Sequence, residues 1–213
     1  MMFLQMWNVT ERQPEDYAKY LTEKQPGFSR KDGYINPYGD SPFDHENVGE
    51  EVYFHILNHA KKYVHIMTPY LILDDQMMDT LTKTAKSGIE VAIIMPHIPD
   101  KWYAFAVAQT YYEELISAGV QIYEYTPGFV HAKVFVSDND TATVGTINLD
   151  YRSLYHHFEC GTFIYNNPVV WEIERDFQNT LKACQKITML DVKARRIGMK
   201  MVGRVLRLIA PLM

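Results

Sequence analysis

Short apolar segments alternate with amphipathic segments through the middle of this chain. Residues 63–69 (YVHIMTP) and 89–95 (IEVAIIM) have the composition of strands, and residues 74–87 between them have a helical pattern. A second helical segment, residues 101–118, leads to a third strand at residues 120–125. Strands separated by helices are typical of parallel sheets, because a parallel connection must cross over one face of the sheet. We therefore expect an α/β fold with a mixed, largely parallel central sheet flanked by helices on both faces.

Single residues mark where these segments begin and end. Asp74 or Asp75 can cap the first helix with its carboxylate, and Gly88 and Gly119 stand where the two helices stop. Further along the chain, Asp138-Asn139-Asp140 separates two short apolar runs and predicts a hairpin. The remaining strand and helix are expected at residues 160–165 and 168–184.

Charge is distributed unevenly along the chain. The net charge is −5, yet residues 182–213 hold eight Lys or Arg and one acid, which leaves −12 on residues 1–181. An acidic body argues against a nucleic-acid binder, which usually presents a basic face. The two cysteines form no disulfide framework and no metal-ligand spacing, so a reduced compartment is expected.

The basic tail has an apolar periodicity of its own. Five apolar residues recur there at steps of three and four: Ile197, Met201, Val205, Leu208 and Leu212. This pattern is typical of a helix that lies on an anionic membrane surface. A helix that docks on another domain would show the same pattern. No apolar run reaches the roughly 20 residues of a membrane span, and the first residues lack a signal-peptide pattern, so we expect this chain alone to be soluble.

The segment HAKVFVSD, residues 131–138, predicts a chemical site. His131 and Lys133 lie two positions apart, so in a strand both point to one face while the following valines face the core. The imidazole of His131 can act as a nucleophile or a general acid, and Lys133 can neutralise phosphate charge. An edge strand with incidental polar residues is the alternative interpretation.

A polar segment downstream supports the site. Gly145 allows a ligand to approach the backbone closely, and Thr146 and Asn148 can donate hydrogen bonds to phosphate oxygens. Ser153 can bind phosphate, and Glu159 can hold the tautomer of His131 through a hydrogen bond. Turn formation, capping and an exposed strand charge are the alternative roles of these residues.

Together these residues resemble a known family. The pattern HxKxxxxD at residues 131–138, followed by GTxN at 145–148 and RS…FE at 152–159, is similar to the phospholipase D superfamily. Residues 34–213 as a whole resemble the C-terminal half of bacterial cardiolipin synthases. One departure is His157, which stands where many members have Asn before the Phe-Glu pair.

The resemblance implies an activity and a set of site residues. It implies a phosphatidyltransferase of phospholipid biosynthesis that joins two phosphatidylglycerol molecules through a phosphohistidine, giving cardiolipin and glycerol without metal or other cofactor. His131, Lys133 and Asp138 would be catalytic, with His131 as the general acid/base. Asp138 lies in a turn, so a structural role is its alternative. Gly145, Thr146, Asn148, Ser153 and Glu159 would bind substrate phosphate.

The chain contains one HxKxxxxD motif, whereas the resemblance implies two that share one active site. Either this is the second catalytic half of a longer enzyme, or two copies pair as in single-motif nucleases of the superfamily. An inactive half-domain is a further alternative. We expect an N-terminal helix and linker to the first half (1–33), the catalytic domain (34–184) and a basic helical tail (185–213). The resemblance places the whole protein in the bacterial cell membrane, with its catalytic domain on the cytoplasmic side.

Overall fold

The computed structural model describes residues 2–20, 32–195 and 197–212, which divide into two compact units at Asp32/Gly33. In the smaller unit, α1 (Met2–Thr10) is followed by a short 3-10 helix, η1 (Tyr17–Tyr20). The sequence predicted one helix over residues 1–24. A turn interrupts it, because the Asn8 side chain bonds both the backbone N–H and the carbonyl of Glu15. Residues 21–24 lie outside the described part.

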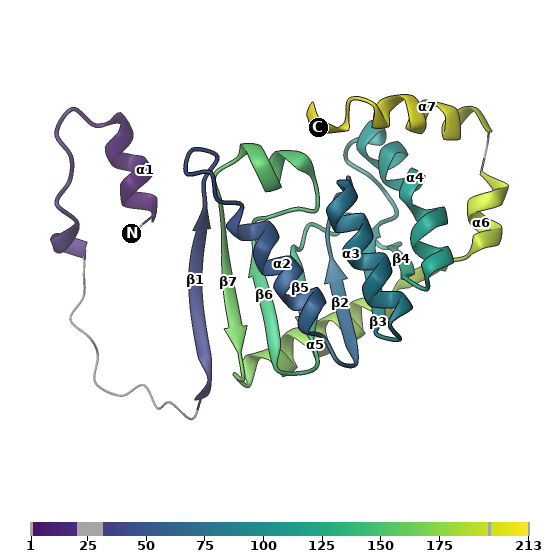
Figure 1. Ribbon diagram of the computed structural model, residues 1–213, viewed down its shortest axis with the longest axis horizontal. Helices are drawn as coiled ribbons and strands as arrows, with labels where there is room; N and C mark the ends of the chain where they lie inside the picture. Colours follow the sequence, from purple (N-terminus) through teal and green to yellow (C-terminus); the bar gives the residue numbers. More distant parts are fainter. Residues whose placement is uncertain (1, 21–31, 196, 213) are drawn as a thin grey trace. The chain divides into compact units, whose positions relative to one another are not determined.

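The larger unit is built on a single sheet of eight strands in the order β1-β7-β6-β5-β2-β3-β4-β8 among the described residues (Figure 1). The strands are β1 (Tyr34–Asp40), β2 (Tyr63–Met67), β3 (Glu90–Pro96), β4 (Gln121–Tyr125), β5 (Val134–Ser137), β6 (Thr141–Gly145), β7 (Glu159–Tyr165) and β8 (Cys184–Ile187).

The mixed α/β sheet is confirmed, but the expectation that it would be largely parallel is wrong. Only β2–β3 and β3–β4 are parallel pairs. The other five pairings are antiparallel. A parallel pair needs a crossover connection, and only α3 (Asp75–Lys86) and α4 (Trp102–Ala118) connect parallel neighbours in the sheet. β5, β6 and β7 follow one another as antiparallel neighbours, whereas α5 (Val169–Leu181) leads from β7 to β8, which lies beside β4.

Helices cover both faces of the sheet, as expected (Figure 1). The helices α2 (Val48–His59), α3 and α4 pack on one face around the main apolar core. On the opposite face, α5 (Val169–Leu181) inserts Val170 and Phe177 against strands β2 to β6. The tail forms α6 (Met189–Ala194) and α7 (Ile197–Arg207), followed by a 3-10 turn, η4 (Ala210–Leu212).

The predicted cap of α3, the glycines that end α3 and α4, and the position of the hairpin are confirmed. The Asp74 carboxylate caps α3 by accepting the backbone N–H of Met77 at 2.7 Å. Gly88 and Gly119 follow α3 and α4 with φ of +93° and +103°, the left-handed conformation that ends many helices. Three residues separate β5 from β6, and Asp138 and Asn139 both have positive φ, as the two central residues of a primed β-turn do; the Asp140 N–H donates to the Ser137 carbonyl at 3.2 Å.

The predicted helix over residues 168–184 is too long. It ends at Leu181, and Cys184–Ile187 forms β8, which pairs antiparallel with β4. None of the helices in the described ranges is long and apolar enough to cross a membrane.

Candidate active site

His131 and Lys133 lie in the irregular segment that immediately precedes β5. The strand begins at Val134, one residue later than the sequence predicted. The backbone carbonyl of Lys133 accepts the N–H of Gly145 at 3.2 Å, so this segment is fixed beside the end of β6. The four residues of β5 are all buried. The strand therefore anchors the segment in the core and leaves the two polar side chains at its entrance.

Lys133 is a buried lysine, only 8% exposed. Its Nζ donates a hydrogen bond to the carbonyl oxygen of His131 at 2.6 Å. Burial lowers the pKa of Lys133, while the carboxylates of Glu159, Asp150 and Asp100 oppose that shift. These carboxylates show which acidic groups surround the cation.

His131 is exposed directly beside this buried cation. Partial desolvation and the charge of Lys133 lower the pKa of His131, with a smaller opposing effect from Asp100. The ring of Phe129 lies 5.6 Å from the imidazole, centroid to centroid. Both effects disfavour the protonated form of an imidazole that is open to solvent.

Three of the predicted phosphate-binding residues form one hydrogen-bond network with Glu159. The Thr146 hydroxyl donates to Glu159 Oε2, and Ser153 Oγ donates to Glu159 Oε1 at 2.9 Å. Asn148 Nδ2 in turn donates to Ser153 Oγ at 3.0 Å. The other polar atom of that amide, Asn148 Oδ1, is buried and has no hydrogen-bond partner in the described part of the chain. The structure therefore brings together polar residues that lie up to 13 positions apart.

Gly145 supports this network by allowing two strands to approach closely. A Cβ atom at this position would collide with the backbone of Cys160 and Gly161 on β7. Next to it, the Thr146 N–H donates to the Cys160 carbonyl at 2.8 Å. Gly145 is needed because another strand's backbone lies against it, whereas we expected from the sequence that a ligand would approach the backbone there.

Ser153 is positioned by a single π-helical turn, Arg152–His156. Its backbone N–H donates to Asp150 Oδ1 at 2.8 Å, and both residues are buried. Burial raises the pKa of Asp150, and hydrogen bonds from Ser153 and Asn148 oppose that rise. Neither this turn nor Asp150 was singled out from the sequence.

Asp138 lies at the opposite end of β5 from His131. Its carboxylate accepts hydrogen bonds from the backbone N–H groups of Lys61, Lys62 and Tyr63, at 2.6–3.0 Å. It therefore joins the β5–β6 hairpin to the start of β2. The structure does not bring Asp138 together with His131 and Lys133, so its predicted catalytic role gains no geometric support.

Glu159 also differs from its expected contact. The predicted hydrogen bond to His131 is not among those of the described residues; the Glu159 carboxylate is bonded by Thr146 and Ser153 instead. His157 Nδ1 lies 3.7 Å from Glu159 Oε1, so the imidazole at this position faces the same carboxylate.

Two charged residues near His131 were not predicted from the sequence. Asp100 and Lys101 follow β3, and both act on the pKa of His131. The Tyr70 hydroxyl, which follows β2, donates to Asp100 Oδ2 at 2.6 Å. Carboxyl ends of neighbouring parallel strands meet at one edge of a sheet, and this rule is the signal that would have found them. Within residues 2–20, 32–195 and 197–212, no cluster of His, Cys, Asp or Glu could hold a metal ion.

Comparison with known proteins identifies the family. Residues 53–181 match the family described as "Cardiolipin synthase, PLD-like domain". The chain belongs to the phospholipase D-like family. The resemblance inferred from the motif is thereby confirmed.

Its relatives are longer proteins. The chain is 53% identical over its full length to an uncharacterized protein of Streptococcus mutans, of which it covers 46%. It is 36% identical to a cardiolipin synthase of Clostridium perfringens, matching over 91% of this chain and 44% of that protein. The chain thus spans less than half the length of these relatives.

Solved structures share the phospholipase D-like fold at low sequence identity. Nuc of Salmonella typhimurium, a phospholipase D family member, aligns with a TM-score of 0.61 at 18% identity, over 72% of this chain and 97% of Nuc. Phosphatidylserine synthase of Haemophilus influenzae aligns with a TM-score of 0.66 at 15% identity, over 84% of this chain and 47% of that one. The fold occurs both as nearly a whole chain and as about half of one.

Proposed function

We propose that this chain is one catalytic half of a cardiolipin synthase that transfers a phosphatidyl group between two phosphatidylglycerol molecules. The observation that carries the proposal is the buried Lys133 ammonium beside the exposed His131. A fixed positive charge next to an accessible imidazole suits a reaction in which negative charge builds up on phosphorus. The relatives named cardiolipin synthase supply the substrate class.

The proposed reaction has two steps. One motif histidine attacks the phosphorus of the first phosphatidylglycerol, so that an N–P bond forms and the bond to the glycerol oxygen breaks. A second motif histidine gives that oxygen its proton. The hydroxyl of another phosphatidylglycerol then loses its proton to this second histidine and attacks phosphorus, which breaks the N–P bond. The phosphodiester bond energy is retained, so the scheme calls for no nucleotide.

We assign His131 to the acid/base role in this scheme. Bound phosphate places negative charge beside the imidazole, which raises the pKa of His131 from its lowered value and favours the protonated form needed to release glycerol. Lys133 stabilises the phosphate charge. A phosphate oxygen entering beside it would compete with Glu159 for the Thr146 hydroxyl and with Ser153 for the Asn148 amide. Asp138 maintains the hairpin.

The second histidine must come from outside the single motif. We propose that it comes from the N-terminal half of the longer protein, with residues 34–184 as the second catalytic domain. The cytoplasmic side of the cell membrane is then the proposed location of the whole protein. A phosphodiesterase made of two identical copies is the second candidate, favoured by the alignment with nearly all of Nuc.

The test is turnover by the 213-residue chain on phosphatidylglycerol vesicles with chelator present. His131→Ala is compared with His59→Ala, which removes an exposed histidine at the end of α2. Cardiolipin that requires His131 but not His59 would support the proposal, with the second histidine supplied by another copy. If the folded chain forms no product, a relative's N-terminal half is added. Continued inactivity would overturn the cardiolipin synthase assignment.

A second substrate separates the two candidates. Bis(p-nitrophenyl) phosphate reports phosphodiester cleavage without a lipid acceptor. Hydrolysis of this compound by a dimer that makes no cardiolipin would favour the two-copy phosphodiesterase. Transfer to phosphatidylglycerol with little hydrolysis would favour the synthase.

A further inference from the structure

The last helix, α7, presents its apolar residues to solvent. Ile197, Met201 and Val205 are 76%, 61% and 65% exposed, and Leu208 and Leu212 beyond the helix are 82% and 78% exposed. We call these five residues the apolar stripe. Ile197, Met201 and Val205 recur at steps of four and so share one side of α7, and Leu208 and Leu212 are exposed in the turns that follow it. Single exposed apolar residues are common, but a continuous row marks an interaction surface.

The helix α7 lies on α4 (Figure 1), and the groups of its opposite side that make this contact are small or cationic. Gly203 is buried, and a Cβ atom there would lie 2.5 Å from the Ala106 carbonyl oxygen. The Arg207 guanidinium lies 4.2 Å from the centre of the Tyr111 ring. The helix is therefore held on the domain without using its apolar stripe, which stays free for another partner.

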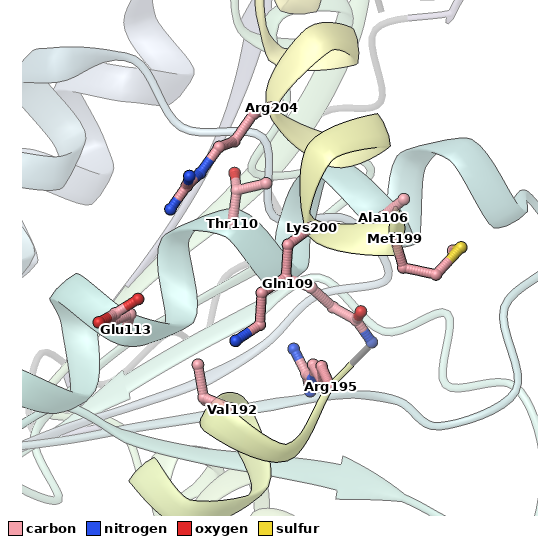
Figure 2. A pocket seen from close by; sticks show the side chains of 9 residues that line it. All are labelled: Ala106, Gln109, Thr110, Glu113, Val192, Arg195, Met199, Lys200 and Arg204. Atoms are coloured by element: carbon pink, nitrogen blue, oxygen red, sulfur yellow. The ribbon is translucent and has the colours of Figure 1, made fainter. Parts of the chain in front are cut away.

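Basic side chains flank the apolar stripe at a small cavity. The cavity lies between α4, α6 and α7, and Figure 2 shows Arg195, Lys200 and Arg204 among the side chains that line it, with Glu113 as the one acidic member. Lys200 Nζ donates to the Lys193 carbonyl at 3.3 Å. The Arg195 guanidinium lies 3.4 Å from Glu124 Oε1 through Nη2, whereas its buried Nη1 has no hydrogen-bond partner among the described residues. No ion pair of the described residues includes Lys200 or Arg204, so their charges are available to an anionic partner.

We infer that α7 is a membrane-contact helix whose apolar stripe enters a bilayer that contains anionic phospholipid. Lys200 and Arg204 then meet lipid phosphates at the cavity. Charge favours this partner, because residues 182–213 carry +7 while the rest of the chain carries −12. The inference rests on the proposed function in one respect: the bilayer is where a phosphatidylglycerol substrate resides. It assigns to the tail the task of keeping the catalytic half at that surface.

The test is co-sedimentation of the 213-residue chain with vesicles, read without turnover. Vesicles of phosphatidylglycerol and phosphatidylcholine are compared with pure phosphatidylcholine. The double variant Val205→Ser/Leu208→Ser is expected to lower partitioning into the anionic vesicles by about tenfold or more. Lys200→Gln is expected to lower it by about fivefold, the effect of one charge near an anionic surface. Val205 and Leu208 are exposed and Lys200 is half-buried at the cavity rim, so circular dichroism should be unaltered by either variant.

Trp171→Ser is the matched control. Trp171 is 61% exposed on α5, which covers the other face of the sheet, and its loss should leave vesicle binding unchanged. Equal binding of the stripe variant and the parent chain would overturn the inference. So would equal binding to neutral vesicles, or self-association of the chain that only the stripe variant loses, because a second copy would then cover the apolar stripe.

The outcome is separable from that of the proposed function. Turnover is measured in parallel on phosphatidylglycerol dispersed in detergent, where no bilayer has to be bound, with a relative's N-terminal half added if needed. A stripe variant that keeps this turnover but loses vesicle binding supports the inference. A chain that binds vesicles but never makes cardiolipin contradicts the proposed function and leaves the contact helix standing.

Discussion

At the scale of single residues, Asp138 shows how a motif residue can act far from the chemistry. Its carboxylate accepts hydrogen bonds from three backbone N–H groups at the start of β2, and its backbone has a positive φ in the hairpin turn. Asn tolerates that conformation but offers only one acceptor oxygen and no charge. Asp138→Asn is therefore expected to lower the free energy of unfolding by about 1–2 kcal/mol, measured by urea denaturation.

Asp140→Asn in the same turn is the control. Its neighbour Thr141 donates to Asp140 Oδ1, a bond that an amide oxygen can replace. If Asp138→Asn instead leaves stability unchanged and abolishes turnover, Asp138 is catalytic and the structural interpretation is wrong.

The motif predicted which residues gather at the site better than it predicted their contacts. His131 and Lys133 lie close together because they are two positions apart in the segment that β5 anchors, and their catalytic role stays a prediction. The partner of Glu159 was missed, because it depends on the π-helical turn that brings Ser153 to the carboxylate. Asp100 and Asp150 were missed because each lies beside Lys133 only through the packing of separate loops.

At the scale of elements, the sequence predicted those helix ends that depend on a single residue, but it did not predict which strands pair. Asp74, Gly88 and Gly119 mark helix ends by properties of single residues, and all three do so in the structure. Strand β8 was missed because its four residues form a strand only by pairing with β4. Whether two strands are parallel or antiparallel likewise depends on which strands lie next to each other in the folded sheet, and the local sequence does not determine this.

Three elements meet at a buried carboxylate. The Tyr155 hydroxyl donates to Glu50 Oε1 on α2 at 2.7 Å and also to Asp74, the cap of α3. Burial, with the nearby Asp74 carboxylate, raises the pKa of Glu50 to about 7. Between the ordinary pKa and this raised value, the folded protein binds more protons than the unfolded chain, so stability falls as pH rises through that window.

Glu50→Gln is expected to remove this pH dependence. Its amide oxygen can still accept from Tyr155, whereas the penalty for burying a charge disappears. At pH 8 the variant should be more stable than the parent by about 1–2 kcal/mol, and near pH 4.5 the two should be equal. Urea denaturation at both pH values measures this. A variant less stable than the parent at pH 8 would show that the ionised carboxylate is favourable.

Two glycines of α7 provide a matched pair for its docking. A Cβ atom at Gly203 meets the Ala106 carbonyl oxygen at 2.5 Å, whereas one at Gly198 meets nothing within 4 Å. Gly203→Ala should therefore loosen α7 and speed hydrogen exchange of its amides. Gly198→Ala should slow exchange, because alanine favours the helix by up to about 1 kcal/mol. Equal effects of the two substitutions would mean that α7 does not pack on α4 through Gly203.

At the scale of the whole molecule, the proposed reaction needs two motif histidines and this chain supplies one, so we expect activity to depend on assembly. If two copies complete the site, specific activity should rise in proportion to chain concentration until the dimer saturates. Turnover measured over a dilution series, beside sedimentation velocity at the same concentrations, checks this. Activity that persists undiminished in a demonstrated monomer would mean that His131 works without a second histidine.

The bond from the Lys133 ammonium to the His131 carbonyl has a consequence for substrate entry. In the proposed reaction, an incoming phosphate would have to compete with that carbonyl oxygen, 2.6 Å from Lys133 Nζ, for the same cation. If the phosphate takes over the ammonium, the backbone carbonyl of His131, the proposed general acid/base, loses its hydrogen bond. Recognition of the phosphate and adjustment of the histidine would thus be a single induced-fit event, and an empty site would keep its cation occupied until a competing anion arrives.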